Sequence, residues 1–547
     1  MASRIVDSPD PVAVGHTGLV ILDGIGLSVA DVVRLADGSA RPVPGTEAMK
    51  RVTESWDAAR QIAATGRVYG RSTGVGANRN EDVPTDAAAE HGLRLLRSHA
   101  GAIGEELPAR QVRAMLAVRA NQLLAGGAGL RPTVVTALCE ALENGAHPVV
   151  NEFGSVGTGD IAALAQAGLA LAGEHPWRET GSGGAGVSGR DAELAGVGGQ
   201  GAAVVGASPS PPQHPEPWRP ASGAPEPQPL DNNDALAFIS SNALTLGQAA
   251  LALHELRGLV EATQVVGALS LLAVDGSHEA YAAPVHAARP HRGSAQVARR
   301  MRELIGAEDR PTPPLGRIQD PYGFRCLPQI HGPAHDAADA LEEVLAIEIN
   351  AAAENPLICP EDMAAYHHGG FYQAQLALAL DHFRLALTQV ARLSTSRLST
   401  LNEPAFTRLR PFLADPEPAS SGVMILEYAA GAALGDLRAF SAPASLGHAV
   451  LSRGVEEQAS FASLAARQTL RACGAYRLVV GCELVAAVRA LRQRDLRPDP
   501  GLPVGRALEL AEAVLDGEQA DRPLTADVTA AAALLDRFTE IWRGSEA

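Results

Sequence analysis

Apolar residues recur along most of the chain with the three- and four-residue spacing of an α-helix, and runs that alternate apolar and polar residues are few. The stretch Gln375–Leu401 is apolar around much of its circumference and has no interior Gly or Pro. A helix of this kind must be buried on several sides, as in a bundle or at a subunit contact. Similar patterns at 335–349, 423–440 and 456–494 predict a mainly α protein with a long central helical bundle.

Strands are expected to be few and short, near Val20–Leu22 and Val149–Val150. The composition changes after Glu174, with GSGGAGVSG, GVGGQG and SPSPPQHPEPWRPASGAPEPQP. Such Gly- and Pro-rich sequence buries too little apolar surface to offset the entropy of ordering, so we interpret it as a mobile insert. The chain is therefore predicted to have four segments: an N-terminal part (1–174), the insert (175–230), a long-helix bundle (231–494) and a C-terminal helix pair (495–547).

Length and charge limit the classes of partner. The 547 residues are enough for several cores, and the formal net charge of −17 disfavours nucleic acids and anionic membranes. Five cysteines are scattered without close pairing, and the N-terminus has no basic start followed by an apolar core. No apolar run reaches the ~20 residues that span a bilayer, because Gln166 and Asp275 interrupt the longest ones. These features predict a soluble, cytoplasmic protein with a small-molecule partner.

The stretch GSVGTGD, residues 154–160, precedes the helical pattern IAALAQAGLALAG. One interpretation is a helix start, with Thr158 or Asp160 as the cap and the glycines permitting positive φ. The other is backbone chemistry, in which the Gly159 nitrogen attacks the Gly157 carbonyl and loss of water leaves an electrophilic imidazolone. Glycine at the attacking position allows the compressed geometry, and the hydroxyl of Thr158 supplies the alkene.

Several further blocks stand out between about residues 55 and 535. They are HPVVNEFGSVGTGDIAALAQAGLALAGE, YGRSTGVG (69–76), RSHAGAIGEELP (97–108), VRANQLLAGGAG (118–129), RIQDPYGFRCLPQIHG (317–332), EINAAAENPL (348–357), GGF (369–371) and EEQASF (456–461). These blocks resemble those of the histidine and aromatic amino-acid ammonia-lyases. The resemblance implies a homotetramer with sites built by several subunits, a smaller N-terminal α+β part that carries the active-site loops, and an Ala-Ser-Gly triad that cyclises into a methylidene-imidazolone.

The chain departs from the family pattern at the prosthetic group. Family members read GSVGASGD, whereas this chain is one residue shorter and has Gly157-Thr158-Gly159 at the triad. Thr158 would give an ethylidene, whose methyl group hinders addition of an amine. The family's Asn-Gly-Thr is replaced here, so that the Asn that holds the ring carbonyl becomes Ser240 unless Asn242 takes its place. The family's GNFH is Gly-Gly-Phe-Tyr at 369–372.

Removing a β-hydrogen from an amino acid needs a strong base, and the resemblance assigns this role to Tyr69. Its loop, YGRSTGVG, is rich in glycine and could close over a substrate. A phenol has a pKa of about 10 and burial raises it, so a cation or hydrogen-bond donors must stabilise the phenolate. The alternative is an ordinary half-buried loop tyrosine.

Arg325 presents a planar fork that suits the carboxylate of an amino acid. Its alternative is an ion pair with Asp320. In the family, the Gln, Tyr and Arg of this motif all face the site, so Gln319 is expected in a polar wall that binds substrate and Tyr322 among the catalytic residues.

Ser98 and His99 resemble the pair that recognises the substrate ring in histidine-type members, although a lone His is more often structural. Glu456 matches an acidic residue of those members and could accept an imidazole N–H or act as acid and base. Its alternative is a solvated helix face beside Glu457. Phe371 is expected against the substrate ring. The other residues expected to bind substrate are Asn121 and Ser240.

No metal or dinucleotide site is predicted. His331, His367 and His368 lack metal-like spacing with carboxylates or thiols, and no Gly-rich run joins a strand to a helix.

Three functions remain open on the sequence. The first is a carbon–nitrogen lyase that eliminates ammonia from histidine or a related aromatic amino acid, using an imidazolone made from residues 157–159. The second is elimination of a better leaving group, such as the quaternary amine of a betaine, without the imidazolone. The third is a catalytically silent homologue in which Thr158 only caps a helix.

Overall fold

The computed structural model describes residues 18–180, 221–310 and 317–543 of the chain, which form two compact units. The first unit comprises Met1–Gln248, Ala346–Tyr372 and Ala449–Ala459, and the second comprises Ala249–Leu345, Gln373–His448 and Ser460–Ala547. Each unit therefore combines segments that are far apart in the sequence. The four sequential segments expected above divide the chain in another way and stay a prediction, and most of the Gly/Pro-rich insert lies outside the described residues.

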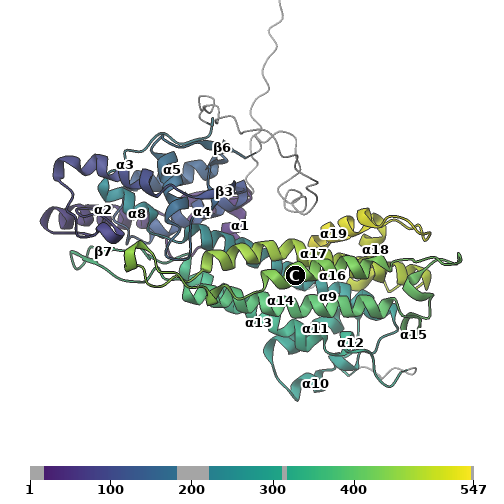
Figure 1. The fold of residues 1–547 in the computed structure, drawn as a ribbon. Helices are drawn as coiled ribbons and strands as arrows, with labels where there is room; N and C mark the ends of the chain where they lie inside the picture. Colours follow the sequence, from purple (N-terminus) through teal and green to yellow (C-terminus); the bar gives the residue numbers. More distant parts are fainter. Residues whose placement is uncertain (1–17, 181–220, 311–316, 544–547) are drawn as a thin grey trace, which may run out of the picture. The chain divides into compact units, whose positions relative to one another are not determined.

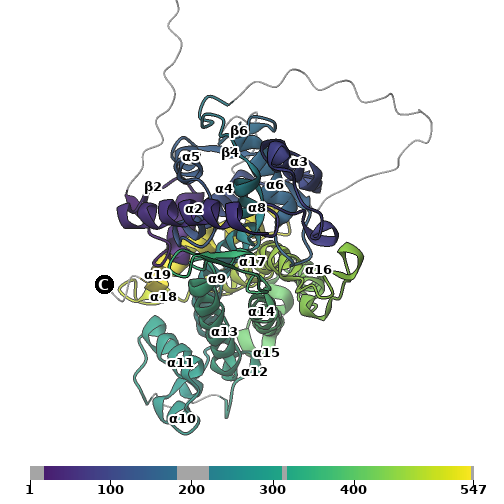
Figure 2. The same cartoon turned by 90° about the vertical axis from the view of Figure 1, so that its left-hand side faces the viewer.

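The first unit is built around α4 (Ala109–Leu124), most of whose side chains are buried. Helices α1 (Val29–Ala36), α2 (Thr46–Thr65) and α5 (Pro132–Glu143) all contact α4. A second group, α3 (Ala88–His99), α6 (Ile161–Leu171) and α8 (Asn232–Ile239), packs together, as Figure 2 shows. The short 3-10 helices of this unit are η1 (Gly76–Asn78), η2 (Thr85–Ala87) and η6 (Ser452–Gly454).

Among the described residues, four two-stranded sheets complete the first unit. The parallel pair is β1 (Leu19–Leu22) with β2 (Arg41–Pro44), and the antiparallel pairs are β3 (Ile103–Glu106) with β5 (Asn151–Phe153), β4 (Ala146–Pro148) with β6 (Trp177–Glu179), and β7 (Leu357–Cys359) with β8 (Ala364–Tyr366). The strand expected near Val20–Leu22 is β1. The strand content expected near Val149–Val150 is confirmed, since β4 ends directly before these two residues and β5 begins directly after them; the pair itself joins two different sheets.

Long helices dominate the second unit. Helix α17 (Ala462–Gln493) packs along α14 (Ala374–Leu401), α16 (Ile425–Phe440) and α19 (Thr525–Arg543), as Figure 1 shows. The other helices are α9 (Ala243–Ala273), which begins in the first unit, α10 (Ala283–Ala287), α11 (Arg292–Ile305), α12 (Tyr322–Arg325), α13 (Leu327–Glu348), α15 (Pro404–Thr407) and α18 (Pro503–Val514), with 3-10 helices η3 (Glu279–Tyr281), η4 (Pro411–Leu413) and η5 (Ala444–Leu446). The mainly α fold predicted from the sequence is confirmed.

One predicted helix begins later than its apolar pattern. The pattern starts at residue 456, but α17 starts at Ala462, because Phe461 has a left-handed φ of 54° that a helix cannot contain. Glu456 instead lies in a loop, where it forms an isolated antiparallel bridge with Leu451. The interpretation of Glu456 as part of a solvated helix face is therefore wrong.

The expectation that no segment is long and apolar enough to span a bilayer is wrong by length and composition. The stretch Asn232–Ala273 is long and apolar enough by length and composition, but 94% of its most apolar window is buried inside the protein. Such burial is typical of a core helix. The cytoplasmic location stays a prediction.

Candidate active site

The loop that carries Tyr69 is anchored by a buried arginine. Arg71 is almost fully buried, and burial lowers its pKa to about 10. Its guanidinium donates hydrogen bonds to three carbonyl oxygens, those of Ala128 (2.6 Å), Gly129 (3.2 Å) and Asn233 (2.8 Å). In return, the side-chain amide of Asn232 donates to the Arg71 carbonyl. Residues 69–76 are therefore fixed to the start of α8 and to the turn after α4.

The Tyr69 hydroxyl accepts a hydrogen bond from the backbone N–H of Gly76, at 2.8 Å. Burial raises the pKa of the phenol above its ordinary value, and the nearby carboxylate of Glu456 also raises it. The Gly76 N–H and the charge of Arg79 act in the opposite direction, because both favour the phenolate. The loop thus supplies the donor and the cation that a phenolate base requires, and Glu456 lies close enough to Tyr69 to affect its ionisation.

Two residues beside Tyr69 were missed as site residues from the sequence. The Tyr69 backbone N–H points at Nε2 of His367, 3.4 Å away, and the two rings meet edge to face with centroids 6.3 Å apart. The Ala77 backbone N–H donates to Oγ of Ser452, at 3.1 Å. His367 had been considered only as a metal ligand, and nothing in the sequence around Ser452 indicated a contact 375 positions away.

The segment Gly154–Asp160 forms a compact turn around Ser155. Its hydroxyl accepts from the Gly157 N–H at 3.2 Å and donates to the Gly159 carbonyl at 3.1 Å. Gly157 has φ of 90° and Gly159 has φ of 119°, a region that residues with a side chain rarely adopt. Gly157 and Gly159 are buried, and Thr158 between them is half-buried.

Asp160 ends this turn, but its side chain does not cap the helix that follows. Its carboxylate accepts from the backbone N–H of Thr245 at 2.7 Å and from the Thr245 hydroxyl at 2.8 Å, so it satisfies the free N-terminus of α9 instead of α6. The Asp160 N–H donates to the Ser241 carbonyl at 2.8 Å. The interpretation of Asp160 as a side-chain cap for α6 is wrong, and the turn is tied to the α8–α9 junction.

The α8–α9 junction is in turn bonded to the β7–β8 region. Oγ of Ser240 accepts from the backbone N–H of Asn355 at 3.0 Å, and the side-chain amide of Asn242 donates to the Phe371 carbonyl at 2.8 Å. Nδ1 of His368 accepts a hydrogen bond from the Gly370 N–H, so the ring proton is on Nε2. Nε2 donates to the Glu354 carbonyl at 2.8 Å. Hydrogen bonds thus connect the turn at 154–160, residues 240–242 and residues 354–371.

Asn121 was expected to bind substrate, and the structure favours a role in the framework. It is fully buried, and its side-chain oxygen accepts from Gly24 N–H at 3.0 Å. Its side-chain nitrogen donates to the Ile349 carbonyl at 2.9 Å and to the side-chain oxygen of Asn350 at 2.8 Å. Both N–H groups are therefore used within the protein.

Ser98 and His99 are the last two residues of α3. Nδ1 of His99 lies 2.8 Å from the Leu95 carbonyl and 2.9 Å from the Ser98 hydroxyl. No described residue forms a hydrogen bond with its other ring nitrogen, Nε2. The half-buried imidazole is consequently oriented by its own helix and keeps one nitrogen for a ligand.

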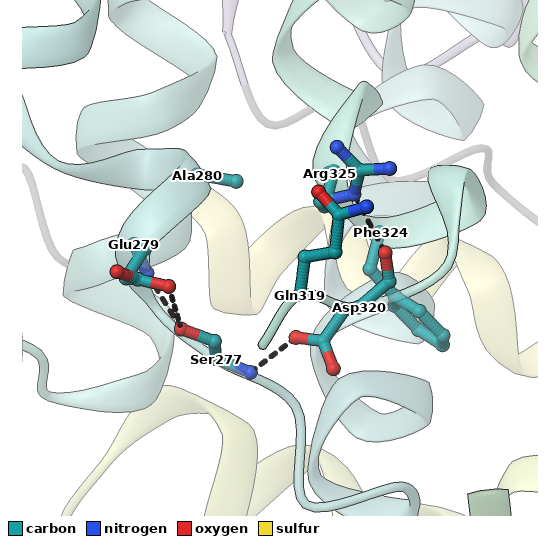
Figure 3. Close-up of a pocket in the computed structure, with 7 residues that line it drawn as sticks. All are labelled: Ser277, Glu279, Ala280, Gln319, Asp320, Phe324 and Arg325. Atoms are coloured by element: carbon teal, nitrogen blue, oxygen red, sulfur yellow. Dashed lines mark hydrogen bonds between the residues drawn. The ribbon is translucent and has the colours of Figure 1, made fainter. Parts of the chain in front are cut away.

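In the second unit, a small cavity of about 30 Å³ lies at the start of α12. Figure 3 shows the side chains of Gln319 and Arg325 close together, with Ser277 and Glu279 on the other side. The full lining is Ser277, Glu279, Ala280, Gln319, Asp320, Phe324 and Arg325. Two of the predicted substrate-binding residues therefore share one cavity.

Asp320 does not neutralise the Arg325 side chain. The Asp320 carboxylate pairs with Arg317 at 2.9 Å and accepts from the Ser277 N–H at 2.5 Å. Nε of Arg325 donates to the Asp320 carbonyl at 2.6 Å, and the guanidinium lies 4.5 Å from the centre of the Tyr322 ring. The two terminal nitrogens of Arg325 bond to no residue in the described part of the chain. The fork is thus oriented and still able to bind an anion, which disfavours the internal ion pair that the sequence left open.

Comparisons with known proteins decide the family. The family model described as aromatic amino acid lyase matches residues 27–202 and 217–513. The chain belongs to the aromatic amino acid lyase family. It is similar to the histidine ammonia-lyases of Geobacillus thermodenitrificans (31% identity over 94% of this chain and 97% of the relative) and Geobacillus kaustophilus (33%, with the same coverage). It is therefore an enzyme of the carbon–nitrogen lyase type.

Solved structures agree with this assignment. The ergothioneine-degrading ergothionase of Treponema denticola superposes with a TM-score of 0.82 at 26% identity, covering 96% of this chain and 99% of that protein. The histidine ammonia-lyase of Trypanosoma cruzi superposes with a TM-score of 0.81 at 25% identity, covering 97% and 95%. The lyase-like fold expected from the sequence is confirmed.

The family carries an imidazolone made from three consecutive residues. The turn at Gly157–Gly159 has a conformation that suits formation of such a ring. Positive φ at both glycines and the bridging Ser155 hydroxyl hold the turn compact. No side chain in the described part of the chain, however, hydrogen-bonds Thr158. Ser240 Oγ accepts from the Asn355 N–H, and the Asn242 amide donates to the Phe371 carbonyl. The turn therefore suits formation of the ring, whereas none of the described side chains is bonded to its central residue.

The described residues contain no group of three or more His, Cys, Asp or Glu side chains that could hold a metal ion. The expectation that the enzyme needs no metal stays a prediction.

Proposed function

We propose that this chain eliminates ammonia from histidine or a related aromatic amino acid, giving the α,β-unsaturated acid. The observation that carries the proposal is the Tyr69 hydroxyl held on the Gly76 N–H, in a loop that Arg71 fixes to the fold. The similarity to histidine ammonia-lyases over 94% of the chain supports the choice of substrate.

In the proposed reaction, Tyr69 acts as the base that removes the β-hydrogen. The phenolate oxygen takes the proton, the electron pair of the C–H bond forms the new carbon–carbon double bond, and the amine leaves with the electrons of the C–N bond. The Gly76 N–H stabilises the phenolate before this step and Arg79 adds a favourable charge, whereas burial and Glu456 oppose ionisation. The base therefore combines high basicity with a donor that keeps its charged form accessible.

Substrate recognition requires side chains that are held in place but are not already paired with a counter-ion of the protein. We propose that the Arg325 fork binds the substrate carboxylate, with Gln319 beside it, because Asp320 is paired with Arg317. His99 and Glu456 suit an imidazole side chain, since a ring nitrogen and a carboxylate can each bond to one of its nitrogens. Phe371 would pack against the substrate ring, and Tyr322 would lie near the carboxylate.

We also propose a homotetramer. Several apolar side chains on α14 and α16 are exposed in the single chain, including Leu378 (60%) and Tyr428 (68%), and Tyr322 is 69% exposed. Apolar surface on two long neighbouring helices is typical of subunit contacts.

A second candidate function is elimination of an amine that leaves without activation. It is favoured because no side chain in the described part of the chain hydrogen-bonds Thr158, while Ser240 Oγ accepts from Asn355 and the Asn242 amide donates to Phe371. The fold match to an enzyme that degrades ergothioneine, a betaine, points the same way. Here the substrate would be a trimethylammonium betaine of an imidazole amino acid, and the same base would act.

The test combines turnover with the intact mass of the chain. L-Histidine should release ammonia and the unsaturated acid in equal amounts, and the mass should lack two waters within residues 157–159. Y69F should lower kcat by roughly 10²–10⁴, the usual contribution of a general base. Y366F is the matched control, since the hydroxyl of Tyr366 bonds only to Asp362 among the described residues, at 2.8 Å, and its loss should leave kcat unchanged.

Full turnover in Y69F would contradict both candidates. An unmodified mass, no ammonia from histidine and release of trimethylamine from histidine betaine would replace the first candidate by the second.

A further inference from the structure

The hydrogen bond on which Tyr69 depends is itself held by a distant segment. Gly76, whose N–H contacts the Tyr69 hydroxyl at 2.8 Å, has φ of 56° and lies against Ser452. A side-chain carbon added at Gly76 would come within 2.6 Å of Ser452 Oγ. The next N–H, that of Ala77, donates to the same Oγ at 3.1 Å. The N–H of the 75–76 peptide thus bonds to the base and the N–H of the 76–77 peptide bonds to Ser452, so the backbone torsions of Gly76 cannot change without breaking one of these bonds.

Ser452 is presented by a loop in an unusual conformation. Three consecutive residues have left-handed φ, Ser452 at 51°, Arg453 at 57° and Gly454 at 82°, although two of them carry side chains. The loop is closed by a bridge in which Leu451 N–H donates to the Glu456 carbonyl at 2.8 Å. Non-glycine residues persist in this region only where the surroundings determine it, and such positions concentrate at functional sites.

The same loop also carries a charge that acts on the base. Glu456 lies at its end, and its carboxylate raises the pKa of Tyr69. The other groups that face the phenol are the cation of Arg79 and the ring of His367. Residues 451–456 therefore contact the Tyr69 loop through Ser452 and influence the base through Glu456.

We propose that Ser452 is a positioning residue for the base: its hydroxyl holds the 76–77 peptide and thereby the backbone conformation of Gly76, so that the Gly76 N–H, which belongs to the preceding peptide, points at the Tyr69 oxygen. The inference rests on the proposed role of Tyr69. Without the hydroxyl, the 76–77 peptide and the backbone torsions of Gly76 gain freedom, and the hydrogen bond from the Gly76 N–H to the phenolate weakens. The phenolate is then less favoured, so the base ionises at higher pH.

The test is the S452G variant, which removes the hydroxyl but accommodates positive φ without strain. The profile of kcat/KM against pH should rise with ionisation of the base. In S452G we expect its ascending limb to move up by roughly one pH unit, with kcat/KM about tenfold lower below that pH and KM little changed. R453G is the matched control, because it relaxes the same loop without touching the Ser452 hydroxyl, and it should keep the wild-type profile.

A second measurement covers the case in which S452G alters the fold of the loop. G76A should lose more activity when Ser452 is present than in the S452G background, because only Ser452 meets the added carbon at 2.6 Å. Strictly additive losses, or an unmoved pH profile in S452G with Y69F inactive, would overturn the positioning role alone. Full activity of Y69F would instead refute the base, and with it the proposed function.

Discussion

The Arg119–Glu354 pair allows a sharp test of how the site is held. Both side chains are essentially buried, at 0% and 2% exposed, with Nη1 2.7 Å from the Glu354 carboxylate. Arg119 also donates to the Phe238 carbonyl at 2.9 Å and to that of Ala237, which are free C-terminal carbonyls of α8. Glu354 leads into Asn355, which contacts Ser240. One guanidinium therefore stabilises the end of α8 and the segment that faces it.

The R119M variant keeps most of the side-chain volume and removes the charge. It leaves a buried carboxylate without a cation and two helix carbonyls without a donor, so we expect a loss of about 3–5 kcal/mol in the free energy of unfolding. With an unfolding entropy of about 2.1 cal/mol/K per residue over 547 residues, this lowers the melting temperature by roughly 3–4 °C if the chain unfolds together.

The melting temperatures of three variants, measured by calorimetry, distinguish loss of the buried ion pair from the loss of any arginine. R178M breaks an exposed pair in the same unit, Arg178–Glu106 at 3.0 Å with both side chains 51% exposed, and should cost at most about 1 kcal/mol. The double variant R119M/E354L should recover most of the loss, because an apolar pair needs no counter-charge. If R119M melts at the same temperature as R178M, the buried pair does not hold this region and the reasoning is wrong.

Two further predictions concern substrate binding and acid stability. R325Q should raise KM roughly 50-fold with a smaller change in kcat, since a charge-assisted hydrogen bond contributes about 1.5–3 kcal/mol. R325K should recover only part of this loss, because lysine lacks the planar fork. An unchanged KM in steady-state assays of R325Q would show that Arg325 does not bind the substrate carboxylate. Burial, aided by nearby Arg113 and Arg257, lowers the pKa of His147 and His335 from 6.5 to about 4, so both rings stay neutral in the folded state while the unfolded chain protonates below pH 6.5. Stability is therefore complete above pH 6.5 and falls as the pH drops toward 4, by roughly 3 kcal/mol for each ring, and urea unfolding at pH 7.5 and 4.5 should show a smaller loss in H335Q than in the wild type.

The sequence predicts those elements whose cause is local. Helix α14 agrees with its pattern within one residue at its start because an uninterrupted apolar repeat leaves no competing structure. The start of α17 was misplaced because a single left-handed residue, Phe461, prevents the helix from extending back along the apolar pattern, and side-chain type does not reveal such a φ. Asp160 was assigned to the wrong helix for a related reason, since its partner, Thr245, is 85 positions away.

Candidate site residues followed the same rule. Residue type and motif were enough to select Tyr69 and Arg325, whose chemistry is intrinsic to the side chain. They were not enough to show that both N–H groups of Asn121 are used inside the protein, or that Ser452 contacts the Tyr69 loop. Such contacts depend on long-range packing, which a single sequence does not display.

An elimination makes two separate demands on an enzyme, and this chain meets them unequally. Removal of the β-hydrogen needs a base with a stabilised charged form, and Tyr69 has its donor, its cation and a loop that is fixed at both ends. Departure of the amine needs either an activating group or an amine that leaves unaided. Of the side chains that would support activation, Ser240 accepts from Asn355 and Asn242 donates to Phe371, and neither is bonded to Thr158 among the described contacts. Because the first demand is the same for either amine, the base and its positioning residues can be tested with whichever substrate reacts. The leaving group is decided separately, by the mass of the turn at Gly157–Gly159.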